Sequence, residues 1–371
     1  MQGQRLWRLI RKEFIQIVRD PSAIAIAFVM PVMLLFLFGY GVSLDARHVP
    51  VAVVVDAPNA ETAQFVARLQ QSPYVAPRFY HDRGQAEQAV MAHRVAGILR
   101  LRSDFGARML RGESAQIGVE VNGVDANTAR ILEGYVQGAW QTWMVLRQQG
   151  KGQTLVLPVT PDTRIWFNPA VRSRDYLVPG LIAVIMTLIG ALLTALVVAR
   201  EWERGTMEAL MATPVTMSEI LLGKLIPYFV LGMGGMILSV ALARWLFDVH
   251  MVGHFMVLLL LSALFLLVAL GMGLLISSVA RNQFVASQVA VIVTFLPAFL
   301  MSGFIFDIHS MPAPIRFITH AVAARYFVAI LQTEFLVGDQ KAVLLTNGLS
   351  LLAMAFIFLG LTWYRSRKRL D

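Results

Sequence analysis

Residues 175–230 have the sequence DYLVPGLIAVIMTLIGALLTALVVAR, then EWERGTMEALMATPVTMSEILLGK from residue 201, then LIPYFV from residue 225. The first run is apolar and long enough to cross a bilayer, and a second such run begins at Leu225. The segment between them carries four glutamates, yet its apolar residues recur at helical spacing. This stretch therefore predicts two membrane spans joined by a short amphipathic helix.

Periodicity places the joining helix at about residues 201–216. Its apolar face, which we expect in the lipid interface, carries Met207, Leu210 and Met211. Its polar face, which we expect toward the cytosol, carries Glu201, Arg204 and Glu208. Pro214 breaks the helix and favours an extended Thr213, after which Thr216 and Glu219 form a capping box for the next helix. Such a helix either transmits force from another protein or only completes the connection between two spans.

The segment EWERGTMEALMATPVTMSEILLGKLIPY, residues 201–228, resembles the cytoplasmic loop of permease subunits of type-2 ABC exporters, the ABC-2 family. The family pattern is E-x-E-R-G-T-x-E-x-L-x-x-T-P followed by E-x-x-x-G-K, and here its last three positions are Glu219, Gly223 and Lys224. In that family the helix docks on the ATP-hydrolysing subunit. The resemblance therefore implies an ATPase-coupling site made of Glu201, Glu203, Arg204, Gly205, Thr206, Glu208, Leu210, Thr213 and Pro214. We expect Gly205 to allow close backbone approach and Pro214 to fix the helix exit.

The composition is that of a polytopic membrane protein. Of 371 residues, 57% are hydrophobic and only 15% charged, whereas soluble domains have about 25% charged residues. The absence of cysteine excludes a disulfide framework and a thiolate metal site. The net charge of +9 would fit a nucleic-acid partner, but its distribution along the chain follows membrane topology instead, so we expect no nucleic acid.

The first 22 residues predict a cytoplasmic amphipathic helix that lies in the membrane interface. Its apolar face carries Leu6, Ile10, Phe14 and Ile17, and its basic residues lie mainly on another face, namely Arg5, Arg8, Lys12 and Arg19. The run over 23–44 is the predicted first span, uncleaved, with a kink at Pro31.

Residues 45–175 have the composition of a soluble domain and alternate between strand and helix patterns. We predict an inserted α/β domain with strands at 49–56, 75–80, 95–101 and 117–123, and helices at 61–71, 84–94 and 127–148. No metal-ligand spacing or nucleophile motif is present, and we interpret His81 and His93 as solvated. The segment 95–131 resembles the extracytoplasmic domain of ABC-2 permeases whose first two spans are widely separated.

Residues 176–371 form the predicted membrane domain, with five further spans at about 177–199, 225–247, 253–277, 284–306 and 343–364. The short segments on the side of the termini hold 13 Lys and Arg residues, against three on the other side. The positive-inside rule therefore places both termini and the 201–224 segment in the cytoplasm, and the α/β domain outside. The predicted fold is an α-helical polytopic membrane protein with six transmembrane helices.

The segment 307–342 is apolar but interrupted by prolines and ionisable residues. A seventh complete span would place the basic C-terminus outside, so we predict re-entrant or interfacial helices. The segment resembles the one that precedes the last span in the family, with an S-G-F-I-F, M-P and A-R-Y-F pattern. Ionisable residues at membrane depth are candidate functional groups. The alternative is that the ionisable residues of this segment lie at the level of the lipid headgroups. The candidate residues here are Asp307, Arg325 and Tyr326.

The chain lacks the phosphate-binding loop G-x-x-x-x-G-K-[ST], so we expect no bound cofactor, no catalytic site and an ATPase on another chain. The resemblance implies an exporter permease in a bacterial inner membrane, paired with a second copy or a paralogue above two ATPase subunits. The large outer domain resembles the multidrug-export branch, some members of which work with periplasmic adaptor proteins. Drugs, lipids and glycan precursors are all substrates within the family, and the sequence does not choose among them.

Two other classes of function stay open at this point. A secondary cation or proton antiporter needs carboxylates near the bilayer midplane, and none lies within the six predicted spans. The other class is a non-transporting scaffold that holds the outer domain for a periplasmic partner. Such a scaffold needs no carboxylates near the bilayer midplane.

Overall fold

The computed structural model describes residues 2–41, 48–121, 126–150, 167 and 172–366. The chain divides into two compact units, Met1–Ser43 together with Arg164–Asp371, and Leu44–Thr163. The predicted start of the inserted domain at Asp45 lies outside the described residues, and its predicted end at Asp175 falls inside a helix.

Six helices of the first unit are long and apolar enough to cross a membrane, which confirms the predicted number of spans. Four are single helices: α8 (Ser173–Glu203), α10 (Met217–Trp245), α11 (Phe255–Ala280) and α16 (Lys341–Arg365). The first span joins α2 (Pro21–Ile24) and α3 (Met30–Gly41) through a π-helical turn, Ala25–Val29. The fifth joins α12 (Gln283–Ala290) and α13 (Leu296–Met301) through a second π-helical turn, Val291–Phe295.

The two π-helical turns have a common cause. Each contains the residue four positions before a proline, Pro31 in the first span and Pro297 in the fifth. A proline ring clashes with the carbonyl of the residue four positions earlier, and a widened turn accommodates that clash without ending the helix.

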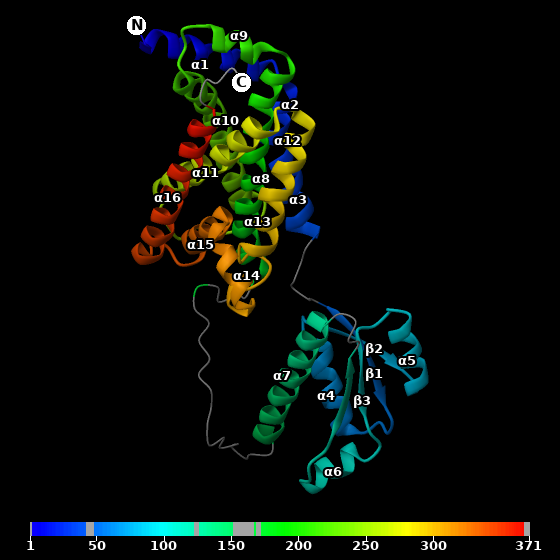
Figure 1. Ribbon diagram of the computed structural model, residues 1–371. Helices are drawn as coiled ribbons and strands as arrows, with labels where there is room; N and C mark the ends of the chain where they lie inside the picture. Colours follow the sequence, from blue (N-terminus) through cyan, green and yellow to red (C-terminus); the bar gives the residue numbers. More distant parts are fainter. Residues whose placement is uncertain (1, 42–47, 122–125, 151–166, 168–171, 367–371) are drawn as a thin grey trace. The chain divides into compact units, whose positions relative to one another are not determined.

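Helix α8 lies at the centre of the membrane unit (Figure 1). Nearly all of its apolar stretch is buried. It packs most extensively against α11. The Thr194 hydroxyl donates to the Leu270 carbonyl at 2.8 Å, and the Ala199 N–H donates to the Ser277 hydroxyl at 2.7 Å. At Gly273 any side chain would collide with Thr194, so the two backbones approach closely there. These contacts fix the position of the last turns of α8.

The two ends of the membrane unit carry different short helices (Figure 1). At one end lie α1 (Gln2–Val18), which packs along α10, and α9 (Thr206–Ala212). At the other end lie α14 (Ala313–Ile318), a 3₁₀ turn (Thr319–Ala321) and α15 (Ala323–Leu336), which meet at a bend of 84°. A bend of this size is typical of a re-entrant segment or of a broken span.

The second unit is an α/β domain around a four-stranded sheet with the order β2-β1-β3-β4. Strands β1 (Val49–Val55), β2 (Val75–Tyr80) and β3 (Gly97–Leu101) are parallel, and β4 (Ile117–Val121) is antiparallel to β3. Alternate residues of β1 enter two cores, because successive strand side chains point to opposite faces. The helices are α4 (Ala60–Gln71), α5 (Arg83–Met91), α6 (Phe105–Arg111) and α7 (Ala126–Gly150), of which the sequence analysis missed α6.

Candidate functional site

The structure separates α8 from α9 by a sharp turn. α8 ends at Glu203, Arg204 is its C-cap residue, and Gly205 has a φ of +67°. The predicted continuous helix over 201–216 is therefore wrong, because a left-handed residue interrupts a helix that apolar spacing alone would continue. No described atom of this chain lies within 4 Å of a Cβ added at Gly205, so within the chain this glycine is required for its left-handed backbone conformation. Close approach of its backbone to an ATPase subunit stays a prediction.

The apolar face of α9 packs against protein. Met207 is buried with Met217 and Ile220 of α10, and Leu210 packs on the same cluster. The expected placement of Met207 and Leu210 in the lipid interface is wrong, because α10 begins eight residues earlier than the span predicted from Leu225 and packs against them. The side chain of Met211, the third residue of this face, lies outside the described residues.

The link from α9 to α10 follows the predicted turn. Thr213 is extended before Pro214, and the Pro214 carbonyl accepts a hydrogen bond from Arg5 of α1 at 3.1 Å. The capping box is confirmed: the Glu219 N–H donates to the Thr216 hydroxyl at 3.3 Å, and the Thr216 N–H donates to the Glu219 carboxylate at 2.7 Å. α9 is thus packed on α10, and the turn that follows it is hydrogen-bonded to α1.

The predicted polar face is only partly exposed. Arg204 and Glu208 are exposed, whereas Glu201 is only 7% exposed. The hydroxyl of Thr206, at the start of α9, donates to the Glu201 carboxylate. The placement of Glu201 on an exposed face with the other two residues is therefore wrong, because its carboxylate turns into the bundle.

Glu201 belongs to a group of charges that we call the lysine–glutamate cluster, made of Lys12, Glu13, Glu201 and Lys224. Its members are buried except Lys12, whose side chain is half exposed. The Lys224 Nζ lies 3.0 Å from a Glu13 oxygen and 2.9 Å from a Glu201 oxygen. The Lys12 Nζ lies 3.2 and 3.4 Å from the same two oxygens. Burial opposes the charge on Lys12, but the two carboxylates raise its pKa above the ordinary value. The cluster ties α1, the end of α8 and the start of α10 together.

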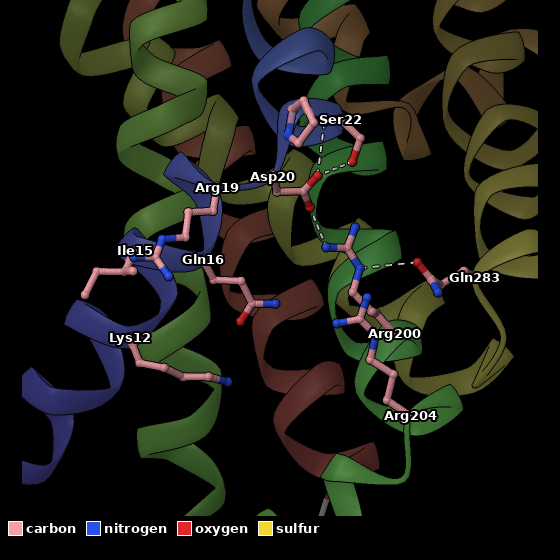
Figure 2. Close-up of a pocket in the computed structure, with 10 residues that line it drawn as sticks. Lys12, Ile15, Gln16, Arg19, Asp20, Ser22, Arg200, Arg204 and Gln283 are labelled. Carbon is pink, nitrogen blue, oxygen red and sulfur yellow. Dashed lines mark hydrogen bonds and ion pairs between the residues drawn. The ribbon is translucent and has the colours of Figure 1, made fainter.

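A second polar link joins the ends of the first, second and fifth spans (Figure 2). The Arg200 Nη1 lies 2.5 Å from the Asp20 Oδ2, and its Nε donates to the Gln283 side-chain oxygen at 3.3 Å. Burial opposes ionisation of Asp20, but hydrogen bonds from Ser22 and Arg200 lower its pKa to about 2. The Glu203 carboxylate accepts the Gln283 backbone N–H at 2.8 Å. Glu203 is therefore fixed at the start of α12.

The segment after the fifth span brings together two of its three predicted site residues. The Arg325 Nη1 donates to the Thr319 hydroxyl at 2.5 Å, and its guanidinium lies 5.9 Å from the centre of the Tyr326 ring. The Tyr326 hydroxyl donates to the His320 carbonyl at 3.0 Å. Asp307 is exposed and caps a separate 3₁₀ turn. Arg325 and Tyr326 thus brace the bend between α14 and α15, and Asp307 lies apart from them.

The same end of the bundle contains a buried carboxylate that the sequence analysis did not select. Glu334 of α15 is fully buried and lies against Gly253, where any side chain would collide with it. Beside it, the hydrogen bond between His254 and Asp339 raises the pKa of His254. The available signal was a glutamate within an apolar helical run. Among the residues that the structure describes, no group of three or more His, Asp or Glu side chains could hold a metal ion.

The chain is similar to known proteins over both of its units. A family profile described as ABC-2 family transporter protein matches residues 22–364. The probable multidrug ABC transporter permease YbhS of Escherichia coli is 45% identical over 370 residues, 98% of each chain. The probable multidrug permease YbhR of the same organism is 26% identical over 90% of each chain. The linearmycin resistance permease protein LnrN of Bacillus subtilis is 22% identical over 72% of this chain and 74% of that one.

Proposed function

The chain belongs to the ABC-2 family of transporter proteins, and from this premise we propose that it is the permease subunit of an exporter for drugs or other amphipathic compounds. The observation that carries the proposal is the similarity to a probable multidrug permease over nearly the full length of both chains. The chain lacks a phosphate-binding loop, so we assign ATP binding and hydrolysis to a separate subunit and no enzymatic step to this one.

The α9 region is the proposed point of contact with that ATPase. Its exposed surface includes Arg204, Glu208 and Thr213, while its apolar face is anchored on α10. The lysine–glutamate cluster connects the same region to α1 and α8. A push on α9 would therefore reach three helices at once, because rigid elements linked by buried contacts move together.

A second permease copy or a paralogue is the proposed partner within the membrane. The first, fifth and sixth spans each leave most of their apolar surface uncovered. On the fifth span this surface includes Val291, Ile292 and Val293. Pairing would cover part of it and enclose a pathway between two subunits, with lipid around the remainder. A periplasmic adaptor protein is a further proposed partner of the α/β unit.

The proposed topology places both termini and α9 in the cytoplasm of a bacterial inner membrane, and the α/β unit outside. Single cysteines introduced by Ser114→Cys and Ser218→Cys should then react with a membrane-impermeant maleimide from opposite sides of the membrane. Both serines are exposed, and the chain has no native cysteine, so labelling reports the introduced site alone. Labelling of both from the same side would contradict the orientation.

The function is tested by co-expression of the chain with an ATP-binding cassette ATPase subunit from the same genome. We expect the two to purify together and ATP hydrolysis to rise on addition of amphipathic drugs. Phospholipids and glycan precursors serve as the comparison substrates. An ATPase that co-purifies but responds only to one of these two classes would overturn the assigned substrate. An ATPase that responds to no substrate would support the scaffold alternative.

A further inference from the structure

A polar pocket lies between α1 and the ends of the first, second and fifth spans, with a volume of about 610 Å³ (Figure 2). Four cationic side chains line it, and only one carboxylate, that of Asp20, lies among them. The cations are Lys12, Arg19, Arg200 and Arg204.

The carboxylate of Asp20 already has hydrogen-bonding partners within the chain. Asp20 accepts hydrogen bonds from the Ser22 N–H at 3.0 Å and from the Ser22 hydroxyl at 2.5 Å, and it pairs with Arg200. Lys12 is shared with the lysine–glutamate cluster and its side chain is half exposed. Within the described parts of the chain, no acceptor is recorded for the guanidinium groups of Arg19 and Arg204. Two cations of the pocket therefore have no counter-charge among the described residues.

The excess of cations over carboxylates favours an anion in this pocket, and Arg19 and Arg204 are exposed and accessible to one. Arg200 and Arg204 are four residues apart at the end of one helix, so their side chains share a face and their like charges repel. Guanidinium groups bind phosphate oxygens in a bidentate manner, and several converging on one concave site are typical of phosphate recognition.

The position of the pocket indicates that the anion comes from a lipid headgroup. Pro21 and Ser22 begin the first span, Gln283 begins the fifth, and Arg200 lies in the last turn of the second. All of them therefore lie at the level where span ends meet lipid headgroups. Ile15, which lines the pocket, is an exposed apolar side chain that would contact an acyl chain, and Val18 and Phe284, each next in sequence to a lining residue, are exposed as well. Arg204 lies both in this recess and at the edge of the α9 surface proposed for the ATPase, where Glu208 and Thr213 carry the proposed protein contact.

We propose that this pocket binds the phosphate of an anionic phospholipid of the cytoplasmic leaflet. Basic pockets between membrane helices on this side are suited to such headgroups, because the leaflet itself is anionic. The bound lipid would link the ends of three spans. The inference uses the proposed orientation but not the transport activity, and its test measures lipid binding alone.

The test uses the full chain, delipidated in a neutral detergent and titrated with dioleoyl phosphatidylglycerol in mixed micelles. The readout is the midpoint of thermal unfolding, followed by tryptophan fluorescence. We expect phosphatidylglycerol to raise the midpoint, and phosphatidylcholine to have little effect. In the double variant Arg19→Gln/Arg204→Gln, the half-saturating lipid concentration should rise by about tenfold, because charge-assisted hydrogen bonds to the phosphate are lost.

The matched control is Arg8→Gln/Arg11→Gln, which removes two exposed cations of α1 that lie outside the pocket. Its half-saturating concentration should stay within about twofold of the parent, since only general surface charge is reduced. Equal weakening in the two double variants would overturn the pocket as the binding site. Stabilisation by inorganic phosphate at the same concentrations would overturn the lipid as its occupant. A midpoint that rises only on addition of the ATPase subunit would assign the cations to a protein interface and also overturn the proposal.

Discussion

Lys224→Met is expected to lower the free energy of unfolding by about 3 kcal/mol, the largest effect on stability that we foresee for a single substitution in this chain. The Lys224 side chain is 3% exposed and its ammonium lies within 3.0 Å of carboxylate oxygens of Glu13 and Glu201. Among the described residues, its removal leaves Lys12 as the one cation that pairs with these two buried carboxylates. The measurement is denaturant unfolding of the purified chain in mixed micelles.

Lys12→Met is the matched control, because it removes a cation from the same cluster. The Lys12 side chain is half exposed and its ion pairs are longer, so we expect a loss below about 1 kcal/mol. The triple variant Glu13→Gln/Glu201→Gln/Lys224→Met should recover part of the loss, since it leaves no uncompensated buried charge. If Lys224→Met and Lys12→Met lowered the free energy of unfolding equally, burial would not determine how much each lysine of the cluster contributes to stability.

The spans could be predicted from the sequence because their signal is local. A run of apolar residues long enough to cross a bilayer identifies each span, and the capping box at Thr216 and Glu219 lies within four residues. The strands of the α/β unit were found in the same way, from β-branched runs such as Val49–Val55. The short helix α6 was missed because seven residues carry too little periodicity.

The interior of the candidate site could not be predicted because its partners are distant in sequence. Glu13 and Lys224 lie 211 residues apart, and no local pattern indicates that they meet. Glu201 occupies a helical position that spacing assigns to a polar face, and only the packing of α1 against α10 shows that this position is buried. A lysine at the border of an apolar run, as at Lys224, is the one signal that would have pointed to a buried partner.

Glu208→Lys is expected to abolish association with the ATPase while leaving the permease folded. Glu208 is exposed on α9, and no side-chain contact to it is recorded within the described residues, so its replacement should change stability by no more than about 0.5 kcal/mol. At a docked interface the new cation replaces attraction with repulsion, and a close like-charge pair costs several kcal/mol. Each 1.4 kcal/mol corresponds to about a tenfold loss of affinity. The measurement is the amount of ATPase that co-purifies with equal amounts of permease, together with drug-stimulated hydrolysis.

Two controls separate a specific contact from a general effect of charge. Glu208→Gln removes the attraction without adding repulsion and should weaken association less than Glu208→Lys. Glu133→Lys reverses an exposed carboxylate on α7, in the other unit, and should leave association unchanged. Glu201→Lys is unsuitable as a test, because it would place a third cation in the lysine–glutamate cluster and disturb folding. If Glu208→Lys binds the ATPase as well as Glu133→Lys does, α9 is not the docking surface, and its packing on α10 only closes the turn between two spans.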